Sequence, residues 1–533
     1  MTPYEAEEFT RAEEDILRRY FTNLDRPVFA LVNLPEVVKG ALFARYSRTA
    51  KSLRRLFLDE FLEDLDVSGD ESVDATTGMR RAEELYDRVF FQYGDDSVAQ
   101  LGGVHLACEQ ASNVLTKVLE WGRIMSYLEQ STRYIRYDQR SEGRYRYFRD
   151  PDVLNSGHGT RYVGEIDRMF DIYSGLIPVM EQFFKDAVPK RTTDADIAYK
   201  MAIRAKALDS IRGLLPAAAF SNVGIYGSGQ AYEALLLRMR ASALPEARTY
   251  SDMMLVELRK VIPSFLKRVD LADRGQVTSD YMSNNAEAID DLSQRLLDVS
   301  APAATESSVD LVDFDPDAEV KLVTAMLYPT SSLSEREIVD QVLKMTVDER
   351  LSVMKAYVGD RTNRRHRPGR ALERVDYRFD VLGDYGAFRD LQRHRMCTIE
   401  WQRLSTRHGY VMPDVIDMVR KTNQFTDVMS RSAELHDSLV GEFPNQAPYA
   451  VSLAYRMRYS MQMNARSAMH ILELRSALQG HPTYRSVAQD MHRLIRERAG
   501  HKAIAEMMVF VDHSQDADLE RLNAENRAAK RPQ

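Results

Sequence analysis

The sequence predicts a chain of mixed strands and helices, organised as two tandem copies of one unit behind an N-terminal helix. A strand-like run followed by helical patterns begins near residue 27 and begins again near residue 307. Several landmarks of the first half also recur in the second half, in the same order and at similar separations. An ordered series of this kind indicates an internal repeat.

The predicted organisation has five parts along the chain. Residues 1–26 form a polar amphipathic helix, and residues 27–271 form the first repeat. Residues 272–306 form a linker that carries a helix, because turn-forming residues surround one amphipathic segment. Residues 307–515 form the second repeat, and residues 516–533 form a charged tail.

Three pairs of segments define the repeat. "ALFARYSR" corresponds to "TAMLYPTSS". "SNVLTKVLEWGRIMSYLEQSTRY" corresponds to "YGAFRDLQRHRMCTIEWQRLSTRHGY". "IRGLLPAAAFSNVGIYGSGQAYEALLLRMRAS" corresponds to "QAPYAVSLAYRMRYSMQMNARSAMHILELRSA".

Composition and charge limit the possible classes of protein. A content of 44% hydrophobic and 29% charged residues is typical of a globular chain. The net charge of -8 argues against a dedicated nucleic-acid binder. Only two cysteines, Cys108 and Cys397, are present, so we expect no disulfide framework, no zinc site and a reducing compartment. With no signal-peptide pattern and no apolar run of roughly 20 residues, we expect a cytoplasmic protein without a membrane span.

The segment "SYLEQSTRYIRYD" brings together a carboxylate, a hydroxyl and a guanidinium. Glu129, Ser131 and Arg133 lie two residues apart, so in an extended segment they would project from one face. The planar donors of arginine suit a phosphate group. In a helix, Glu129 and Arg133 would instead pair as i and i+4, and a surface salt bridge is the plainer alternative.

The second half carries two basic clusters. Arg393, His394 and Arg395 are adjacent and could hold an anionic cofactor. The alternative is a basic patch at a helix C-terminus, where the helix dipole favours positive charge. Upstream, "NRRHRPGRALE" adds further cations in a Pro/Gly loop, with a solvated loop as the alternative: Arg364, Arg365, His366, Arg367 and Arg370.

The late helical segment "MNARSAMHILELRSALQ" offers polar groups on two faces. Asn464 and Arg475 lie eleven residues apart and share one face, whereas Arg466 and His470 share another. The alternative is a half-buried helix whose arginines extend to solvent. Basic neighbours could lower the pKa of Cys397, but we expect this cysteine to be packed in the core.

At these residues the chain resembles the flavin-dependent thymidylate synthases, whose signature has the form R-H-R-x-x-S-x-N-E-x-S-x-R-Y. The first half, "WGRIMSYLEQSTRY", keeps the second arginine as Arg123 and keeps the later Glu, Ser, Arg and Tyr. Trp121 and Gly122 replace the first Arg and the His, and Leu128 replaces the Asn.

The second half keeps the Arg-His pair that the first half loses, and it loses the Glu, Ser and Arg that the first half keeps. It keeps the Arg-His-Arg run as residues 393–395. Without gaps, Trp401, Arg403 and Ser405 then stand where Glu, Ser and Arg are expected. A two-residue insertion would recover part of the pattern through Ser405 and Arg407.

Other segments support the resemblance. "YGDDSVAQ" is similar to the family's Gly-His-x-Ser-Val-x-Glu segment, with Asp95 in place of His, and "RPGRALERVDYRF" in the second half keeps Glu373. "RGLLP" carries Arg212, with Pro448 at about that point of the second half. "NARSAMHILELRS" matches the family's C-terminal helix.

The resemblance implies an α+β fold, in which each copy has an antiparallel sheet with long helices. It implies catalytic roles for Arg240 and Ser131. It implies substrate-binding residues in the first copy and cofactor-binding residues in the second: Glu129, Ser131, Arg133, Arg212 and Arg240 for the substrate, and Arg393, His394, Arg395, Asn464, Arg466 and Glu373 for the cofactor.

The implied reaction is reductive methylation of dUMP, with FAD as cofactor and with methylenetetrahydrofolate and NADPH as co-substrates. Because family members are homotetramers with shared sites, a homodimer of this tandem chain would mimic the tetramer, with a composite site that uses both repeats. Three alternatives stay open: another flavin-dependent one-carbon transfer to a pyrimidine, a non-catalytic nucleotide- or flavin-binding paralogue or scaffold, and RNA binding by "RYIRYDQRSEGRYRYF". The acidic net charge weighs against RNA.

Overall fold

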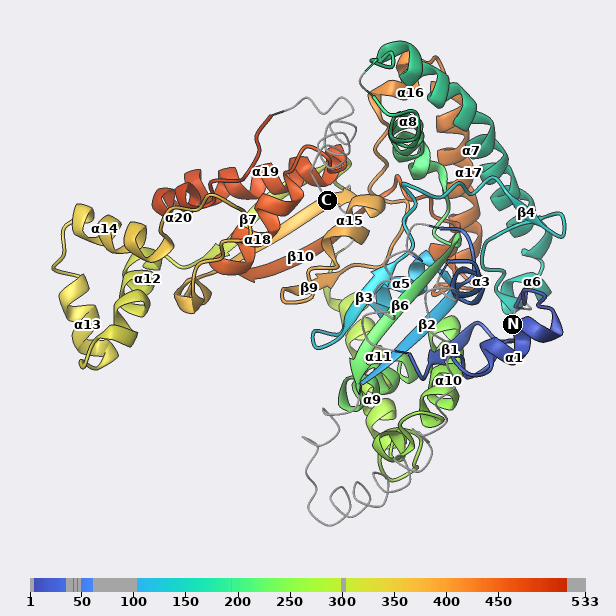
Figure 1. The fold of residues 1–533 in the computed structure, drawn as a ribbon, viewed down its shortest axis with the longest axis horizontal. Helices are drawn as coiled ribbons and strands as arrows, with labels where there is room; N and C mark the ends of the chain where they lie inside the picture. Colours follow the sequence, from blue (N-terminus) through green and yellow to red (C-terminus); the bar gives the residue numbers. More distant parts are fainter. Residues whose placement is uncertain are drawn as a thin grey trace. The chain divides into compact units, whose positions relative to one another are not determined.

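The computed structural model describes residues 4–34, 42, 46, 49–60, 103–192, 194–298 and 303–514. These residues form two compact units, each built on a four-stranded antiparallel sheet (Figure 1). Unit 1 comprises Met1–Gly175, Leu214–Pro302 and Thr426–Ser452. Unit 2 comprises Leu176–Gly213, Ala303–Phe425 and Leu453–Gln533. Each unit therefore includes a segment from the other half of the sequence, whereas the predicted repeats are contiguous.

Unit 1 contains a sheet with the strand order β1-β2-β6-β3. The strands are β1 (Val28–Leu31), β2 (Gly103–Ser112), β6 (Phe220–Ser228) and β3 (Ser126–Glu129). Helix α9 (Gly229–Arg240) packs on β6, and α10 (Pro245–Arg259) packs on β1 and α9 (Figure 1). The other elements of this unit are α1 (Arg11–Leu17), α3 (Leu53–Glu60), α5 (Asn113–Leu119), β4 (Arg140–Ser141), β5 (Arg144–Tyr145), α6 (Pro151–Asn155), η3 (Pro263–Leu266), α11 (Gly275–Leu296) and η6 (Ala447–Ala450).

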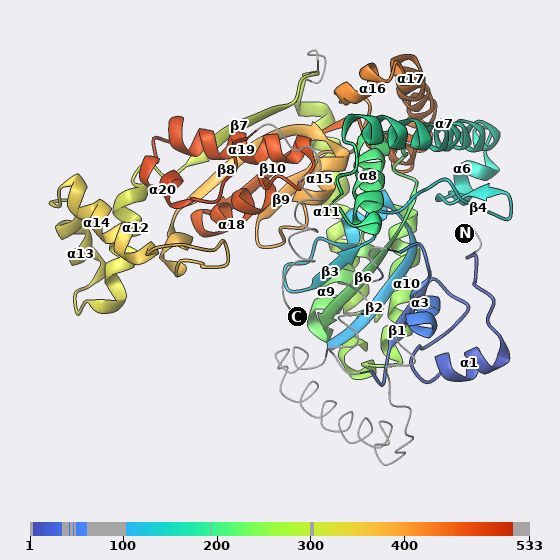
Figure 2. The ribbon, with the colours of Figure 1, turned by 45° about the horizontal axis from the view of Figure 1, so that its top comes forward.

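Unit 2 contains a sheet with the strand order β7-β8-β10-β9. The strands are β7 (Ser308–Phe314), β8 (Asp376–Asp384), β10 (Arg456–Asn464) and β9 (Thr398–Trp401). Helix α19 (Pro482–Glu497) packs on β7 and β8, and α18 (Ala465–Arg475) packs on α19 and β10 (Figure 2). The other elements are α8 (Asp196–Ile211), α12 (Ala318–Leu327), η4 (Tyr328–Thr330), α13 (Glu335–Val342), α14 (Val347–Val358), η5 (Arg370–Arg374), α15 (Tyr385–Leu391), α16 (Asp414–Met418) and α20 (Lys502–Met507).

Three further elements are divided between the units. Helix α7 (Gly159–Ala187) belongs to unit 1 through Gly175 and to unit 2 beyond it. Helix α17 (Thr422–Leu439) belongs to unit 2 through Phe425 and to unit 1 beyond it. The short η2 (Arg212–Leu214) is divided after Gly213.

Strands β3 and β9 pair with β6 and β10 in the same register, which confirms the tandem repeat. Ser228 ends β6 and caps α9, and Asn464 ends β10 and caps α18. Ser126 of β3 pairs with the residue two positions before Ser228, and Thr398 of β9 pairs with the residue two positions before Asn464. The α+β fold with antiparallel sheets is thereby confirmed.

The N-terminal helix is shorter than predicted. Among the described residues 4–26, the helix comprises Arg11–Leu17 and begins with a capping box between Thr10 and Glu13. The chain then turns so that Phe21 pairs with Leu31 as an isolated bridge, and its side chain enters the core. Core packing and strand pairing therefore end this helix.

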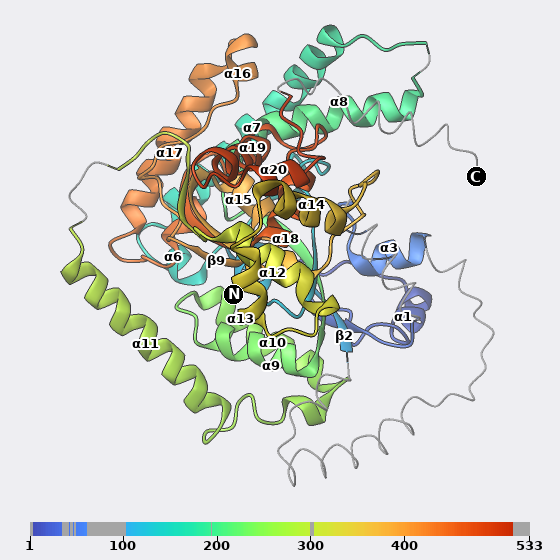
Figure 3. The same ribbon diagram turned by 90° about the vertical axis from the view of Figure 1, so that its left-hand side faces the viewer.

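A helix does lie in the predicted linker. Helix α11 is long, and most of its residues are exposed (Figure 3). Near its N-terminus, Ser279 is buried and donates a hydrogen bond to the Leu237 carbonyl of α9. The linker boundaries themselves stay a prediction. The segment "YGDDSVAQ", most of "ALFARYSR" and the charged tail lie outside the described residues.

Glu246, in the first turn of α10, is a buried carboxyl that joins three parts of unit 1. Its Oε1 accepts a hydrogen bond from the Ser112 backbone N–H at 2.9 Å. Its Oε2 accepts from the Ser112 hydroxyl at 2.6 Å and from the Tyr449 hydroxyl at 2.7 Å. Because Ser112 also caps α5, this carboxyl fixes the corner between β2 and α5. Burial raises the pKa of Glu246 to about 7.

We expect unit 1 to lose stability as the pH rises from about 4.5 to about 7. The pKa of Glu246 rises from an ordinary 4.5 to about 7 on folding, so the folded state keeps this proton over a range where the unfolded state has lost it. Ionising Glu246 should cost roughly 3 kcal/mol of unfolding free energy across this range. The Glu246→Gln variant has no carboxyl to ionise at this position. Its thermal midpoint should therefore rise relative to that of the wild type as the pH increases. Glu287→Gln on exposed α11 is the control. If the thermal midpoints of Glu246→Gln and the wild type differ by the same amount at every pH, Glu246 does not have a raised pKa.

Candidate functional site

A basic cavity of about 330 Å³ lies in unit 2. Its described lining comes from the loop after α14, the turn between α15 and β9, and helix α18 between Arg466 and Glu473. A cavity of this volume is within the range of small-molecule sites. We call it the basic cavity because six of its lining residues are arginines: Arg361, Arg364, Arg367, Arg393, Arg395 and Arg466.

The Arg-His-Arg run lies in the turn that follows α15. The His394 backbone N–H donates to the Leu391 carbonyl at 3.1 Å, and the Cys397 N–H donates to the His394 carbonyl at 3.0 Å. These bonds close the turn between α15 and β9. All three residues of the run line the basic cavity, so the structure brings the predicted cluster together. Cys397 is buried and also lines it.

His394 is held as a neutral imidazole. The Arg475 Nε donates to His394 Nε2 at 2.8 Å, and because this guanidinium nitrogen can only donate, Nε2 must accept. The proton of the neutral ring therefore lies on Nδ1. Burial, and then the nearby positive charge of Arg475, lower the pKa of His394 well below its usual range.

A buried ion pair holds the loop of the basic cavity. Arg361 and Glu473 form a two-point contact, with Nη1–Oε1 at 2.6 Å and Nη2–Oε2 at 2.7 Å. The Arg361 side chain is 3% exposed and the Glu473 side chain is 0% exposed. Arg361 Nη1 also donates to the Met507 carbonyl at 3.0 Å. The pair fastens the loop that carries Arg364 and Arg367 to α18.

Two predicted cofactor residues have structural partners instead. The Asn464 side chain accepts a hydrogen bond from the Ser467 N–H at 2.8 Å, as the N-cap of α18. Glu373 forms ion pairs with Arg370 and Arg466. Neither residue belongs to the described lining of the basic cavity. Arg466 does line it, and its Nε donates to the Pro368 carbonyl at 3.0 Å.

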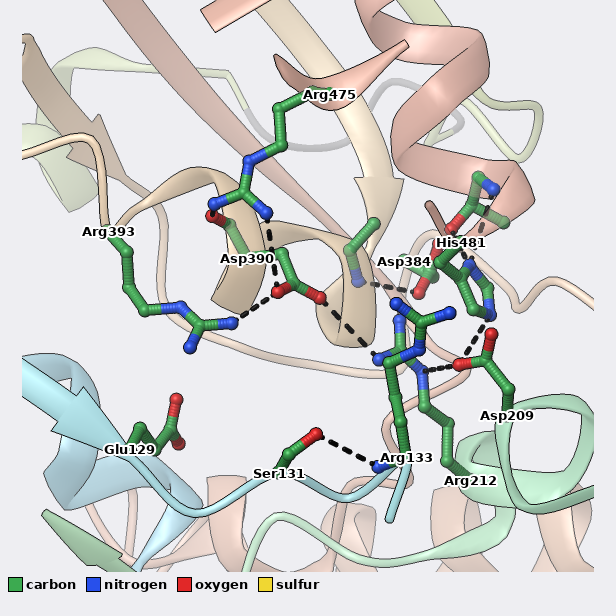
Figure 4. A network of polar contacts seen from close by, with 12 residues as sticks. Glu129, Ser131, Arg133, Asp209, Arg212, Asp384, Asp390, Arg393, Arg475 and His481 are labelled. Carbon is green, nitrogen blue, oxygen red and sulfur yellow. Dashed lines mark hydrogen bonds and ion pairs between the residues drawn. The ribbon is translucent and has the colours of Figure 1, made fainter. Parts of the chain in front are cut away.

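Asp390 gathers three guanidinium groups beside the basic cavity (Figure 4). It pairs with Arg393 at the shortest distance, and its oxygens lie 3.6 Å from both Arg212 and Arg475. Arg212 comes from the first half of the sequence but belongs to unit 2. Its Nη2 is buried and has no hydrogen-bond partner among the described residues. A first-repeat arginine thus lies in the second-repeat cluster.

Glu129, Ser131 and Arg133 do not form the extended face that the spacing predicted. Strand β3 ends at Glu129, because its pairing with β6 ends there. Ser131 and Arg133 lie in a turn, where the Arg133 N–H donates to the Ser131 hydroxyl at 3.3 Å (Figure 4). The surface salt bridge is also wrong, because Glu129 is buried, with its Oε2 3.4 Å from Lys117 Nζ.

Arg240 is the last residue of α9 and pairs with Asp252 at 2.6 Å. Counted from the helix caps, the residue equivalent to Arg475 is Met239, one position earlier. Trp401 of β9 and Glu129 of β3 pair with equivalent positions of β10 and β6. The two residues are therefore equivalent, as the alignment of the signature without gaps predicted.

Sequence reasoning did not assign Arg361, Asp390 or Arg475 to the site. The helical spacing predicts only that Arg475 shares a helix face with Asn464. Asp390 and Arg361 gave no motif signal, although Arg361 lies beside the basic loop. Within the described part of the chain, no group of His, Cys, Asp and Glu side chains could hold a metal ion. None of the helices described there is long and apolar enough to cross a membrane.

Residues 44–264 and 310–501 match the family described as "Thymidylate synthase complementing protein". A UPF0159 protein of Chlamydia pneumoniae is 42% identical over 527 residues, which is 98% of each chain. The UMP/dUMP methylase PolB from Streptomyces cacaoi, bound with 5-Br dUMP, has 16% identity and a TM-score of 0.30, over 39% of this chain and 97% of that chain. The flavin dependent thymidylate synthase ThyX from Helicobacter pylori, complexed with FAD and dUMP, has 17% identity and a TM-score of 0.28, over 37% and 99%.

Removing one partner of the buried Arg361–Glu473 pair should destabilise unit 2 strongly. We expect Glu473→Ala to lower the free energy of unfolding by about 3–5 kcal/mol, because it leaves a buried guanidinium uncompensated. The double variant Arg361→Met/Glu473→Leu should recover most of this loss. Urea unfolding measures both effects. Glu497→Ala, in the exposed pair with Arg493, should change little, and an equal loss in that control would contradict the prediction.

Nitrogen NMR should find His394 neutral at pH 6, with its proton on Nδ1. In Arg475→Met, the nearby charge and the donor to Nε2 are both lost, so the pKa of His394 should rise. A titration followed by the ¹⁵N shifts of the ring measures this. An unchanged pKa and tautomer in the variant would show that Arg475 does not set the state of His394.

Proposed function

The chain belongs to the family of flavin-dependent thymidylate synthases, as two tandem copies, and we propose that it catalyses the reductive methylation of dUMP to dTMP. In this proposal FAD binds in the basic cavity of unit 2, and methylenetetrahydrofolate and NADPH are the co-substrates. The observation that carries the proposal is the set of six arginines around the neutral His394 in one cavity.

The donor chemistry of the basic cavity fits a flavin dinucleotide. Its planar guanidinium groups can each bind two oxygens of a diphosphate. Glu473 is the one carboxylate in the described lining, and Arg361 neutralises it, so little negative charge opposes an anionic ligand. When bound, the flavin would supply the reducing electrons, which NADPH replenishes.

Residues of this chain would orient the ligands and balance their charge. We infer that Arg393, Arg395 and Arg466 bind the phosphates of the cofactor. His394 would donate a hydrogen bond from Nδ1–H without adding charge, because its pKa is lowered well below its usual range. Arg475 positions this ring through Nε2.

The nucleotide residues are proposed separately. Arg212 has a buried Nη2 without a hydrogen-bond partner among the described residues, which supports a role in binding an anion. We propose that it contacts the phosphate of dUMP. Glu129, Ser131 and Arg133 of unit 1 stay candidates for the pyrimidine and phosphate, as does Arg240. The homodimer and the composite site also stay predictions.

Replacing Arg393 should weaken flavin binding selectively. We expect Arg393→Ala to raise the dissociation constant of FAD by roughly 10–100-fold, the effect of losing a charged hydrogen bond. Arg133→Ala should raise that of dUMP instead. Visible absorbance of the purified protein titrated with FAD, with and without dUMP, measures both constants. The control is Arg370→Ala, whose side chain is 85% exposed.

Two outcomes would count against the proposal. Absence of flavin binding in the wild type would remove the enzyme assignment and leave a scaffold. Equal loss of both ligands in both variants would contradict the division of roles. If both ligands bind but no labelled one-carbon unit passes from methylenetetrahydrofolate to dUMP, the chain is a binding paralogue or acts on another pyrimidine.

A further inference from the structure

A second cavity, of about 320 Å³, lies in unit 1 and is acidic. It is enclosed by the start of α6, the start of α10 and the adjoining ends of β2 and β6. None of its described lining residues is Lys, Arg or His. We call it the acidic cavity, and its described lining includes Gln110, Phe148, Asp150, Phe220, Glu246 and Tyr250.

The same place in unit 2 is almost filled. The Phe148 N–H donates to the Ala218 carbonyl, and the equivalent bond in unit 2 joins Val411 to Ala454. The cavity beside Val411 measures about 30 Å³, which is room for one water. Equivalent positions of the two repeats differ as follows: Phe148 is replaced by Val411, Asp150 by Pro413 and Glu246 by Thr483.

A strand irregularity aims Gln110 into the acidic cavity. Between Cys108 and Ala111, strand β2 has a bulge, in which two residues oppose one of β6. Gln110 adopts a φ of 58°, and Asn222 Oδ1 accepts from its backbone N–H at 3.0 Å. At the equivalent position of unit 2, strand β8 has no bulge, and the one residue Leu382 pairs regularly with β10. Such strained residues persist where the surroundings hold them, often beside binding sites.

Asp150 is a buried residue whose carboxylate lines the acidic cavity. The residue is 1% exposed, and its Oδ1 caps α6 by accepting from the Asp152 and Val153 N–H groups. Both of these hydrogen bonds use Oδ1, and no hydrogen bond or ion pair of Oδ2 is found among the described residues. Burial raises the pKa of Asp150. A buried carboxylate needs a donor or a cation to offset its lost hydration. Glu246, in contrast, already accepts from three donors.

We propose that the acidic cavity binds a small organic cation with a flat ring, such as an aromatic amidinium or a protonated aminoheterocycle. Its N–H group would donate to Asp150 Oδ2. The rings of Phe148, Phe220 and Tyr250 supply flat apolar walls that favour an aromatic cation. The Gln110 side chain adds a second polar group. This site does not depend on flavin binding in unit 2.

Benzamidinium, a flat aromatic amidinium, is the probe, and neutral benzamide is its matched control. Ligand NMR titrations of the full chain give both dissociation constants. We expect benzamidinium to bind with a constant of about 1 mM or lower. Benzamide should bind at least about tenfold more weakly, because it lacks the charge that pairs with Asp150. Equal binding of the two probes, or no binding of benzamidinium by about 20 mM, would overturn the proposal.

Three variants locate the binding. Asp150→Asn keeps the helix cap, since Asn caps as well as Asp, and should weaken benzamidinium about tenfold. Thr249→Phe should fill the cavity and remove binding of both probes. Asp414→Asn makes the same charge change at the exposed start of α16 and should have no effect. If Asp150→Asn and Asp414→Asn bind benzamidinium like the wild type, the cation binds elsewhere and the proposal is wrong.

Discussion

The basic cavity depends on one interaction, the buried pair between Arg361 and Glu473. The pair joins a loop to helix α18 with two short contacts and almost no solvent exposure. Desolvation makes such a pair costly unless its geometry is good and its other hydrogen bonds are made. The Met507 carbonyl accepts one of these other hydrogen bonds from Arg361. With the loop fixed, Arg364 and Arg367 line the same cavity as the Arg-His-Arg run. The pair therefore contributes to shape more than to net stability.

Buried carboxylates balance part of the positive charge of the arginines in and beside the basic cavity. Asp390 pairs with three arginines, and Glu473 pairs with a fourth. This arrangement has a chemical consequence for His394. With cations around it and little solvent, the ring stays neutral and offers a donor at Nδ1. The cavity can then bind an anion without requiring every nearby group to be charged.

The two repeats keep one fold and differ in their cavities. In unit 1, Trp121 and Gly122 replace Arg393 and His394, and the Arg238 guanidinium lies 3.8 Å from the centre of the Trp121 ring. In unit 2, Trp401 replaces Glu129 and packs near Phe388, with ring centroids 5.4 Å apart. The large cavities also differ in sign, basic in one repeat and acidic in the other. The two copies therefore share strand pairing and helix caps, and they differ in the side chains that line their cavities.

The sequence by itself determined the repeat, the α+β class and the Arg-His-Arg cluster, since strand and helix patterns and adjacent residues are local properties. It could not decide that Ser131 and Arg133 lie in a turn, because the end of β3 is set by pairing with β6. Tertiary structure alone decided the remaining contacts of the site. Arg361 and Glu473 are 112 positions apart, and Arg475 and His394 are 81 apart. Contacts at such separations depend on how helices pack on the sheet, which no local pattern specifies.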